Sequence, residues 1–483
     1  DAMARYKRLR GYDVKYLTGT DEHGQKVENA AKAAGVSPKE HVDGIVALFK
    51  NAWKALDIDY DIFIRTTDDF HIAAVQKIFK KLHDQGDIYK GVYEGWYCTP
   101  DESFFTDYQL ADGKCPDCGR EVERIKEDAY FFKQSKYADR LLQHYEDNPD
   151  FIVPHYRRNE MINSFLKPGL EDLCVSRTSF TWGVPVEFDS GHVVYVWIDA
   201  LSNYITALGF MSEDDGLYQK YWPADVHMMA KEVVRFHAII WPIMLMALGE
   251  PLPKQIIGHG WLMYEGQKMG KSLGNAIDPI ALAKEYGVDA IRYFLLREFT
   301  LGPDGNFSKK NLIARINADL ANDLGNLLSR TVGMVEKYFN GELPVLRGEA
   351  DIDTELKQLI HASIANYENA MDKLNFSDGL TAVWQIISRA NKYIDETQPW
   401  VLAKDEAHRE RLAETLYNLA ETLRIVSILI SPVMPNTPAV IRAQLNIADE
   451  KLSRWESVKT FGLLPRTVKV TKGAAAFPRI ETK

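Results

Sequence analysis

The stretch Gly266-Gln-Lys268-Met269-Gly270-Lys271-Ser272-Leu-Gly-Asn275 carries the most informative pattern in the chain. Two lysines stand among glycines directly after an apolar run. Glycine lets a backbone approach a phosphate closely, and two ammonium groups can neutralise polyphosphate charge. A Walker A phosphate loop would need glycine at position 265, where the chain has glutamate, so that motif is excluded. For this stretch alone, a solvated basic turn is the alternative interpretation.

Residues 268–275 resemble the KMSKS loop of class I aminoacyl-tRNA synthetases, with Gly270 where serine is usual. Further stretches resemble the bacterial methionyl-tRNA synthetases, and the resemblance runs in order from residue 1 to about residue 463. These stretches are Thr18-Gly-Thr-Asp-Glu-His-Gly-Gln25, Val196-Trp-Ile-Asp-Ala-Leu-Ser-Asn-Tyr204, Lys231-Glu-Val-Val-Arg-Phe-His-Ala-Ile-Ile-Trp-Pro242, Gly258-His-Gly-Trp261, Asp289-Ala-Ile-Arg-Tyr293 and Asn391-Lys-Tyr-Ile-Asp-Glu-Thr-Gln-Pro-Trp400. Each motif alone is moderate evidence, whereas seven in one order identify the family.

The composition is that of an ordinary globular protein. Of 483 residues, 46% are hydrophobic and 26% are charged, which excludes a disordered or collagen-like chain. The length suggests about three domains. The net charge of −10 argues against non-specific coating of nucleic acid, although a local basic face could still bind it.

Membrane, targeting and disulfide signals are absent from the sequence. The longest apolar run, residues 238–248, is shorter than a bilayer span and contains Pro242. The N-terminal residues are charged and form no signal peptide. Four cysteines cannot build a disulfide framework, so we expect a reducing, cytoplasmic compartment.

Hydrophobic periodicity changes along the chain. Short apolar runs first alternate with amphipathic stretches, which indicates a parallel sheet covered by helices. The expected strands are residues 14–17, 193–197, 226–229 and 255–262, and the expected helices are residues 37–56 and 70–85. After residue 308, apolar side chains recur every three to four residues, which predicts an antiparallel helix bundle.

The resemblance implies an α/β Rossmann-like class I catalytic domain with a zinc-knuckle connective insertion, followed by an all-α anticodon-binding bundle. The expected parts are residues 1–90 (catalytic, first part), 91–178 (insertion), 179–264 (catalytic, second part), 265–315 (KMSKS loop and stem-contact region), 316–463 (anticodon-binding bundle) and 464–483 (tail or linker).

The resemblance also implies an activity: ATP-dependent attachment of methionine to tRNA(Met) through methionyl-adenylate, with Mg²⁺ accompanying ATP. The family's His-x-Gly-His motif is not found in this sequence. We therefore expect the chain to lack its first strand and half of its ATP site. A catalytically incomplete tRNA-binding fragment, or another class I synthetase, is the alternative. The short insertion disfavours the synthetases that carry a long editing domain, and the oligomeric state is not indicated.

A site for methionine should combine an apolar, aromatic pocket for a flexible, polarizable side chain with a carboxylate for the ammonium group. Asp21 follows an expected strand, where α/β folds place their ligands, and its alternative role is that of a helix N-cap. By resemblance the pocket is lined by Trp197, Ala200, Tyr204, Phe236, His237 and Trp241. Each of these aromatic residues alone would more often be a core residue.

The resemblance assigns the phosphate chemistry to two regions. Lys268, Lys271 and Ser272 are the expected catalytic residues of the loop. The expected ATP-binding residues are Lys231, His259, Gly260, Met269 and Lys271. Arg177 would belong to the wall of the pocket entrance, and a surface ion pair is its alternative.

Cys98-x-x-Asp101 and Cys115-x-x-Cys118 have the paired spacing of a zinc knuckle. Zinc accepts three thiolates and one carboxylate oxygen, although related enzymes often have cysteine or histidine at all four positions. We therefore expect a structural Zn²⁺ ion, with Asp101 as the unusual ligand. Cys174 stands alone and is expected to be a core residue.

Recognition of unstacked anticodon bases needs aromatic or guanidinium stacking together with polar groups on base edges. Arg389 and Asn391, at one end of an expected helix, and Trp455 are the candidates in the bundle. Packing against the catalytic body is the alternative for Trp455.

Overall fold

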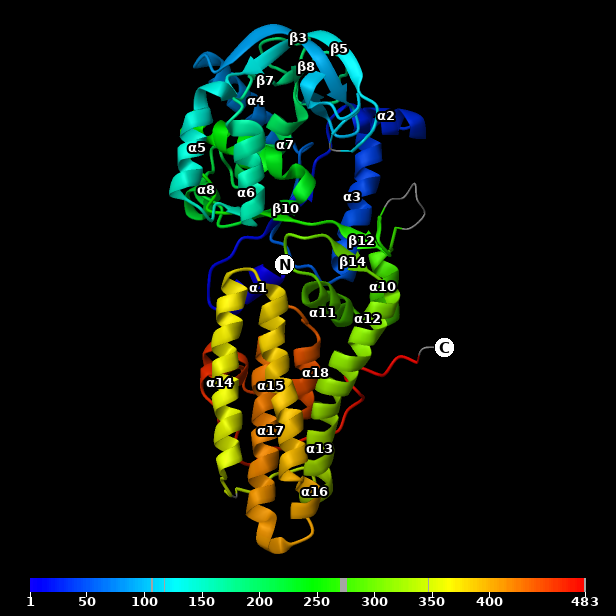
Figure 1. Cartoon of the computed structure of the whole chain (residues 1–483), viewed down its shortest axis with the longest axis vertical. Helices are drawn as coiled ribbons and strands as arrows, with labels where there is room; N and C mark the ends of the chain where they lie inside the picture. Colours follow the sequence, from blue (N-terminus) through cyan, green and yellow to red (C-terminus); the bar gives the residue numbers. More distant parts are fainter. Residues whose placement is uncertain (106, 117, 270–275, 346, 482–483) are drawn as a thin grey trace. The chain divides into compact units, whose positions relative to one another are not determined.

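The computed structural model describes residues 1–105, 107–116, 118–269, 276–345 and 347–481. The chain forms two compact units (Figure 1), which we describe separately. The mixed unit contains Lys15–Asn51 and Tyr60–Trp261. The helical unit contains Asp1–Val14, Ala52–Asp59 and Leu262–Lys483. The chain therefore enters the mixed unit twice. The six-part division expected from the sequence stays a prediction.

Two short parallel sheets form the α/β part of the mixed unit. Their strands are β1 (Leu17–Thr20) beside β2 (Ile62–Arg65), and β10 (His227–Ala230), β11 (Ile256–His259) and β6 (Ile152–Val153) in that order. The helices α2 (Gln25–Ala34) and α3 (Pro38–Ala55) connect β1 to β2. The expected strand at residues 14–17 begins only at its last residue, because its partner β2 begins at Ile62, opposite Leu17.

An antiparallel sheet forms the insertion. Its strand order is β4 (Ser103–Phe105), β3 (Ile88–Cys98), β5 (Glu123–Phe132) and β7 (Leu173–Cys174). A separate pair joins β8 (Ser176–Arg177) to β9 (Val193–Val194). Cys98, Phe105 and Cys115 form a small core of their own in this insertion.

The core of the mixed unit is built around its helices. They are α4 (Asp69–Asp84), α5 (Ala138–Asp147), α6 (His155–Met161), α7 (Val196–Thr206), α8 (Gly216–Tyr221) and α9 (Trp241–Leu248), with the π-helical turns η3 (Ile162–Leu166) and η5 (Phe236–Ile240). Most of the apolar run at residues 238–248 is buried in this core. None of the described helices is long and apolar enough to cross a membrane.

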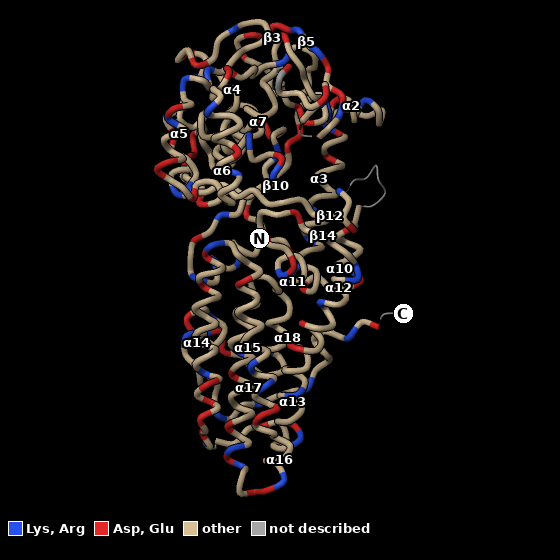
Figure 2. The backbone as a smooth tube through the Cα atoms, viewed as in Figure 1, with Lys and Arg blue, Asp and Glu red and all other residues tan. Residues whose placement is uncertain are grey.

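The helical unit begins with α1 (Ala2–Leu9) and continues with a small sheet and a series of helices. The strands are β13 (Gln267–Lys268), β12 (Leu262–Tyr264) and β14 (Gly305–Phe307). The helices are α10 (Pro279–Tyr286), α11 (Val288–Glu298), α12 (Lys309–Arg315), η7 (Ile316–Gly325), α13 (Asn326–Phe339), α14 (Asp351–Asp372), α15 (Phe376–Thr397), α16 (Pro399–Leu402), α17 (Arg409–Leu429) and α18 (Thr437–Gln444). Basic and acidic residues are both scattered along the bundle helices (Figure 2).

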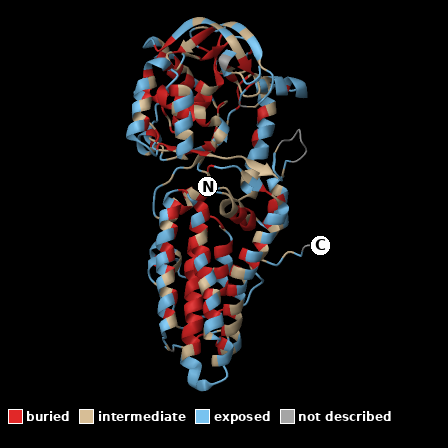
Figure 3. Ribbon diagram, in the orientation of Figure 1, coloured by how far each residue is buried: buried red, intermediate tan, exposed pale blue. Residues whose placement is uncertain are grey.

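Helix α17 is the centre of the bundle. Its apolar spacing predicts one buried face, but every residue from Leu412 to Leu429 is buried (Figure 3). Its polar side chains are consequently paired inside the protein. Glu421 and Arg424 form a bidentate ion pair, with Nη2–Oε1 and Nε–Oε2 distances of 2.7 and 3.0 Å.

Arg292 of α11 joins three distant parts of the helical unit. Its Nε donates to the carbonyl oxygen of Val433 at 2.7 Å, and its Nη1 donates to that of Leu56 at 3.1 Å. Its Nη2 pairs with the carboxylate of Asp1. Asp289, one turn earlier, accepts from the backbone N–H and hydroxyl of Thr437, both at 2.6 Å.

Candidate active site

The loop after β1 carries the carboxylate predicted to bind an ammonium group. Asp21 directly follows β1, at the carboxyl end of a parallel strand. The residue is exposed and lines a recess of about 220 Å³ formed mainly by side chains of α2 and α3. It does not cap the next helix, because the N-cap of α2 is Gly24.

The adjacent Glu22 is buried and already bound. Its two carboxylate oxygens accept from Nε and Nη2 of Arg65 at 2.7 and 2.9 Å. The hydroxyls of Thr20 and Thr67 donate to the same carboxylate at 2.6 and 2.5 Å. Bidentate guanidinium pairs are strong and directional. Asp21 is therefore the carboxylate of this loop that remains accessible to a ligand.

A buried acid–histidine network, which was not predicted, lies beside this loop. Asp199 of α7 is 2.7 Å from Nδ1 of His23 and 2.8 Å from Nε2 of His71. Nδ1 of His71 lies 2.6 Å from the hydroxyl of Thr206. His23 and Asp199 are 176 positions apart, so local sequence patterns could not connect them.

Negative charge accumulates around Asp21. Loss of hydration raises the pKa of Asp21 well above its usual value, and the charges of Glu102 and Asp199 raise it further. Asp21 is exposed, so contact with water limits how far lost hydration raises its pKa. The charges of Glu102 and Asp199 raise the pKa in any case. Glu102 comes from the insertion and contacts the loop: a Cβ on Gly24 would lie 2.0 Å from its Oε1. This crowding explains why position 24 is glycine, which also has a φ of +108°.

The residues predicted to line an apolar pocket lie together. Trp197 stacks on Phe236 with ring centroids 3.7 Å apart and an interplanar angle of 8°. Tyr204 contacts His237 and Trp241, with centroid distances of 5.6 and 5.9 Å. Ala200, on the same helix as Trp197 and Tyr204, is buried. Helix α7 and the segment from η5 to α9 therefore bring the predicted set into one aromatic cluster.

The two histidines of this cluster are neutral. Nδ1 of His237 donates to the carbonyl oxygen of Val233 at 2.9 Å, so its Nε2 accepts from the Tyr204 hydroxyl at 2.7 Å. His227, which the sequence did not single out, accepts from Nε1 of Trp241 at 3.2 Å. Burial lowers the pKa of His237 to about 4 and that of His227 to about 3. The cluster thus presents an apolar, uncharged surface.

Acidification from pH 7.5 to 5 is expected to destabilise the mixed unit. In the unfolded chain each imidazole binds a proton near pH 6.5, but in the folded chain His237 does so only near pH 4. The unfolded state binds more protons, so the free energy of unfolding decreases as the pH falls, by about 2 kcal/mol for His237 at pH 5. Urea unfolding at both pH values measures the decrease. His237→Gln should remove about 2 kcal/mol of it, and an unchanged pH dependence would contradict the assignment.

The predicted ATP-binding residues fall in different parts of the chain. In the mixed unit, Nζ of Lys231 lies 3.9 Å from the ring centroid of Trp261, whose Nε1 donates to Glu232 at 2.7 Å. His259 and Gly260 precede Trp261 at the end of β11 and are half-buried. In the helical unit, Lys268 is exposed on β13 and Met269 is half-buried. Lys271 and Ser272 lie outside the described residues.

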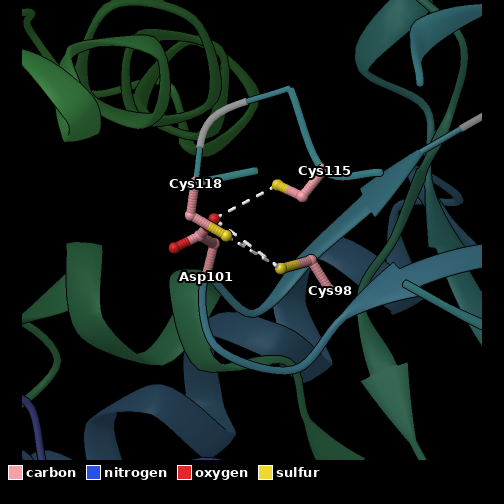
Figure 4. A group of neighbouring side chains, drawn as sticks. All are labelled: Cys98, Asp101, Cys115 and Cys118. Atoms are coloured by element: carbon pink, nitrogen blue, oxygen red, sulfur yellow. Dashed lines mark hydrogen bonds between the residues drawn. The ribbon is translucent and has the colours of Figure 1, made fainter. Parts of the chain in front are cut away.

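Three thiols and a carboxylate converge at the tip of the insertion (Figure 4). The ligand atoms of Cys98, Asp101, Cys115 and Cys118 all lie within 4.8 Å of one another. The Sγ atoms of Cys98 and Cys118 are 3.7 Å apart, and Sγ of Cys115 is 3.2 Å from Oδ2 of Asp101. Two thiolates bound tetrahedrally to zinc at about 2.3 Å would be about 3.8 Å apart. The four side chains therefore fit a zinc ion. Cys174, as expected, is a buried residue of β7.

Three other predicted residues, Arg177, Arg389 and Asn391, are bound by groups of the protein itself. Arg177 is buried and pairs with Glu127, so its ion pair is not on the surface. Arg389 pairs with Glu396 at 2.7 Å, and Nδ2 of Asn391 donates to a backbone carbonyl at 3.1 Å.

Trp455 is 3% exposed and packs on Tyr6 and Tyr367, with centroid distances of 5.9 and 6.1 Å. A base cannot stack on this ring without unpacking the core. The prediction that Trp455 reads an anticodon is therefore corrected, and the packing alternative holds.

Comparisons with known proteins agree along the whole chain. The class I (M) tRNA synthetases match residues 1–128 and 121–332, and the anticodon binding domain of methionyl tRNA ligase matches residues 344–483. A methionine–tRNA ligase of Caldanaerobacter subterraneus subsp. tengcongensis is 63% identical over 483 residues, which are 100% of this chain and 75% of that protein. The methionine–tRNA ligase of Clostridium perfringens is 59% identical over 100% of this chain and 74% of that protein.

Solved structures give the same result. The Mycobacterium tuberculosis methionyl-tRNA synthetase in complex with methionyl-adenylate has a TM-score of 0.94 and 45% sequence identity, covering 99% of this chain and 94% of that chain. The free-state structure of the Mycobacterium tuberculosis enzyme has a TM-score of 0.87 and 42% identity, covering 100% and 93%. The chain belongs to the methionyl-tRNA synthetases of class I.

Proposed function

We propose that the protein attaches methionine to tRNA(Met) in the cytoplasm, through methionyl-adenylate and at the expense of ATP. The observation that carries this proposal is the proximity of opposite chemistries in the mixed unit. The carboxylate of Asp21 is accessible, and the charge of Asp199 raises its pKa. Asp199 lies on the same helix as the aromatic residues Trp197 and Tyr204. Methionine has the matching combination of an ammonium group and an apolar thioether.

Each part of the substrate has a counterpart in this arrangement. The Asp21 carboxylate binds the ammonium group, and the negative surroundings of Asp21 favour a cation. The thioether enters the cluster of Trp197, Phe236 and Trp241, where sulfur–aromatic contacts are favourable. The Tyr204 hydroxyl and neutral His237 fix the polar edge of the pocket without introducing a charge.

The reaction proceeds in two displacements. A carboxylate oxygen of methionine attacks the α-phosphorus of ATP, and pyrophosphate leaves. The terminal ribose hydroxyl of tRNA then attacks the carbonyl carbon of the adenylate, and AMP leaves. Positioning and charge neutralisation carry most of the catalysis. Lys231, His259 and Gly260 bind ATP, and Lys268, Lys271 and Ser272 stabilise the developing phosphate charge, with Met269 as a loop contact to ATP. A Mg²⁺ ion bound by ATP would neutralise further phosphate charge.

Methionine-dependent exchange of pyrophosphate into ATP tests the proposal. In protein that has the complete ATP site we expect exchange with methionine and none with valine, because a β-branched side chain widens the substrate next to its Cα; this chain, without the His-x-Gly-His motif, should exchange poorly. If the protein binds tRNA(Met) but neither binds methionine nor catalyses exchange, it is a tRNA-binding protein of this family and the enzymatic proposal fails.

We further propose that Cys98, Asp101, Cys115 and Cys118 hold a structural zinc ion. The support is the distances among their ligand atoms, which agree with tetrahedral coordination. Asp101 is joined to Glu102, whose carboxylate contacts Gly24, so the metal would stabilise a part of the insertion that reaches the methionine site.

Substitution of one ligand should abolish metal binding. Protein purified under reducing conditions without chelators should contain about one zinc ion per chain, and Cys115→Ser should contain almost none, because three ligands hold zinc far more weakly than four. Asp101→Cys should retain zinc against a higher chelator concentration, since thiolate is the softer ligand. Elemental analysis measures the content. Cys174→Ser is the control, and wild-type protein without zinc would refute the site.

For the tRNA anticodon we propose a further contact, Trp400. This residue lies in the segment that matches the anticodon binding domain, and its side chain is 42% exposed on α16. An exposed aromatic ring gives an unpaired base a stacking surface. Arg389 and Asn391 remain proposals for polar contacts, although both already have protein partners.

Removal of the Trp400 ring should therefore weaken tRNA recognition only. Trp400→Ala should lower kcat/KM for tRNA(Met) by about fivefold to a hundredfold, which corresponds to about 1–3 kcal/mol of stacking. The exchange reaction, which needs no tRNA, should be unchanged. Aminoacylation kinetics measure the effect, and Trp400→Phe should restore most of it. An equal loss in both reactions would show that Trp400 supports the fold rather than the tRNA.

A further inference from the structure

We propose that Asp199 is a positioning residue for the ammonium group of the substrate: through His23 it holds the loop that directs Asp21. The inference rests on the proposed function, because it concerns the same site. It assigns a role to a buried group that the reaction itself does not use, and it explains why two histidines from distant segments meet one carboxylate.

Asp199 and its two histidines form a buried network in which both carboxylate oxygens are bound. Asp199 is 1% exposed, and both of its carboxylate oxygens are bound, one by His23 and one by His71. His71 is 0% exposed, and the hydroxyl of Thr206 binds its other ring nitrogen. Burying a carboxylate costs free energy, and well-packed apolar side chains would often be at least as stable. The network therefore costs free energy of folding that an apolar core would not lose, but it fixes the positions of the His23 and His71 rings.

His23 connects the network to the loop that carries Asp21. Asp21 lies two residues before His23 in the loop after β1, and the backbone N–H of His23 is near enough to the Asp21 carboxylate to oppose the rise of its pKa, so the position of His23 affects the setting of that carboxylate. The ring of His23 is held by Asp199 and by an edge contact to Trp182, with centroids 5.4 Å apart. Nε1 of Trp182 donates to the carbonyl oxygen of Glu22 at 2.6 Å. The loop is thus held at Glu22 and His23, the two residues that follow Asp21.

Asp199 lies on α7, the helix that also carries part of the aromatic pocket. Trp197 and Ala200, two and one residues away, belong to the aromatic pocket, and Thr206 at the end of the helix closes the network. One helix therefore carries both the wall of the side-chain pocket and the support of the ammonium site. This arrangement fixes the side-chain pocket and the ammonium site relative to each other.

The test compares two ligands that differ only in the ammonium group. Binding of L-methionine is measured by calorimetry, and that of 4-(methylsulfanyl)butanoate by ligand-observed NMR, on the full chain. Asp199→Asn should weaken L-methionine binding about tenfold and leave the deaminated acid unchanged within twofold. Asp225→Asn, an exposed acid of the same unit with a side chain that is 81% exposed, is the matched control and should change neither ligand.

A double-mutant cycle with Asp21→Asn locates the effect. If Asp199 acts through Asp21, Asp199→Asn should cost less than twofold in the Asp21→Asn background. Thr206→Val, which removes only the outer hydroxyl, should give the same selectivity with a smaller loss, and it replaces Asp199→Asn if that variant does not fold. Equal weakening of both ligands, additive effects in the cycle, or unchanged methionine binding would overturn the inference. Wild-type protein that binds no methionine would instead refute the proposed function.

Discussion

Replacing Arg424 by methionine should lower the free energy of unfolding by about 3–5 kcal/mol, because the change leaves a buried carboxylate without its partner. Arg424 and Glu421 are fully buried in α17. Besides the ion pair, Arg424 donates to the Ser457 hydroxyl at 2.9 Å and to the carbonyl oxygens of Ser457 and Leu452 at 3.0 and 3.1 Å. Methionine keeps much of the volume but supplies none of these donors.

Urea unfolding followed by far-ultraviolet circular dichroism measures the loss. Lys469→Met provides the control, since its pair with Glu342 joins side chains that are 64% and 50% exposed. Exposed pairs contribute about 0–1 kcal/mol, so this control should be nearly as stable as the wild type. The double variant Glu421→Leu/Arg424→Met should recover part of the loss, because no unpaired charge remains. A loss below about 1 kcal/mol for Arg424→Met would contradict the argument.

The second large effect concerns Asp21. Asp21→Asn should weaken methionine binding about a hundredfold, about 3 kcal/mol, because asparagine keeps the shape but not the charge that faces the substrate ammonium. The affinity for ATP should be unchanged. Glu22→Gln offers a contrast: that carboxylate is bound by Arg65, so its change should reduce stability more than it reduces methionine affinity.

Calorimetric titration with L-methionine measures the Asp21 effect, and Asp225→Asn serves again as the exposed control. A less than threefold change in the dissociation constant would show that another group binds the ammonium. The result also separates the two roles weighed for Asp21, because loss of a helix cap would lower stability by about 1 kcal/mol without affecting affinity.

The sequence predicted the helices of this fold more accurately than it predicted which of their side chains are buried and what those side chains contact. Spacing of apolar residues located α3 and α4 within two residues, since local periodicity determines which residues can share a helix face. It could not show that α17 is buried on all sides, because polar residues such as Glu421 and Arg424 look like a solvated face until their distant partners are known. The start of β1 depends on where β2 begins, which is again non-local.

The same division holds for the site. The methionine pocket was predicted through a resemblance that quoted contiguous motifs, and the structure brings those aromatic residues together. Asp199, His71 and His227 were missed as functional residues, because single buried histidines and acids carry no local signature. Trp455 was misassigned for the opposite reason: a tryptophan near a chain end resembles a stacking platform, and only its contacts with Tyr6 and Tyr367 show that it is core.

The contacts of Arg292 have a consequence for synthesis on the ribosome. Arg292 ties Asp1 and Leu56 to Val433, and Asp289 ties α11 to Thr437. Residues 1–14 precede most of their partners by a long way: Arg292 follows Asp1 by 291 residues, and Asp372 follows Lys7 by 365. The mixed unit is complete at Trp261 and can fold during translation, since domains generally fold as units once their residues are available. Until Arg292 and the later bundle helices emerge, helix α1 can bond only to the early segment Ala52–Asp59, so nascent chains stalled between residues 261 and 430 should expose much of it to proteases and chaperones.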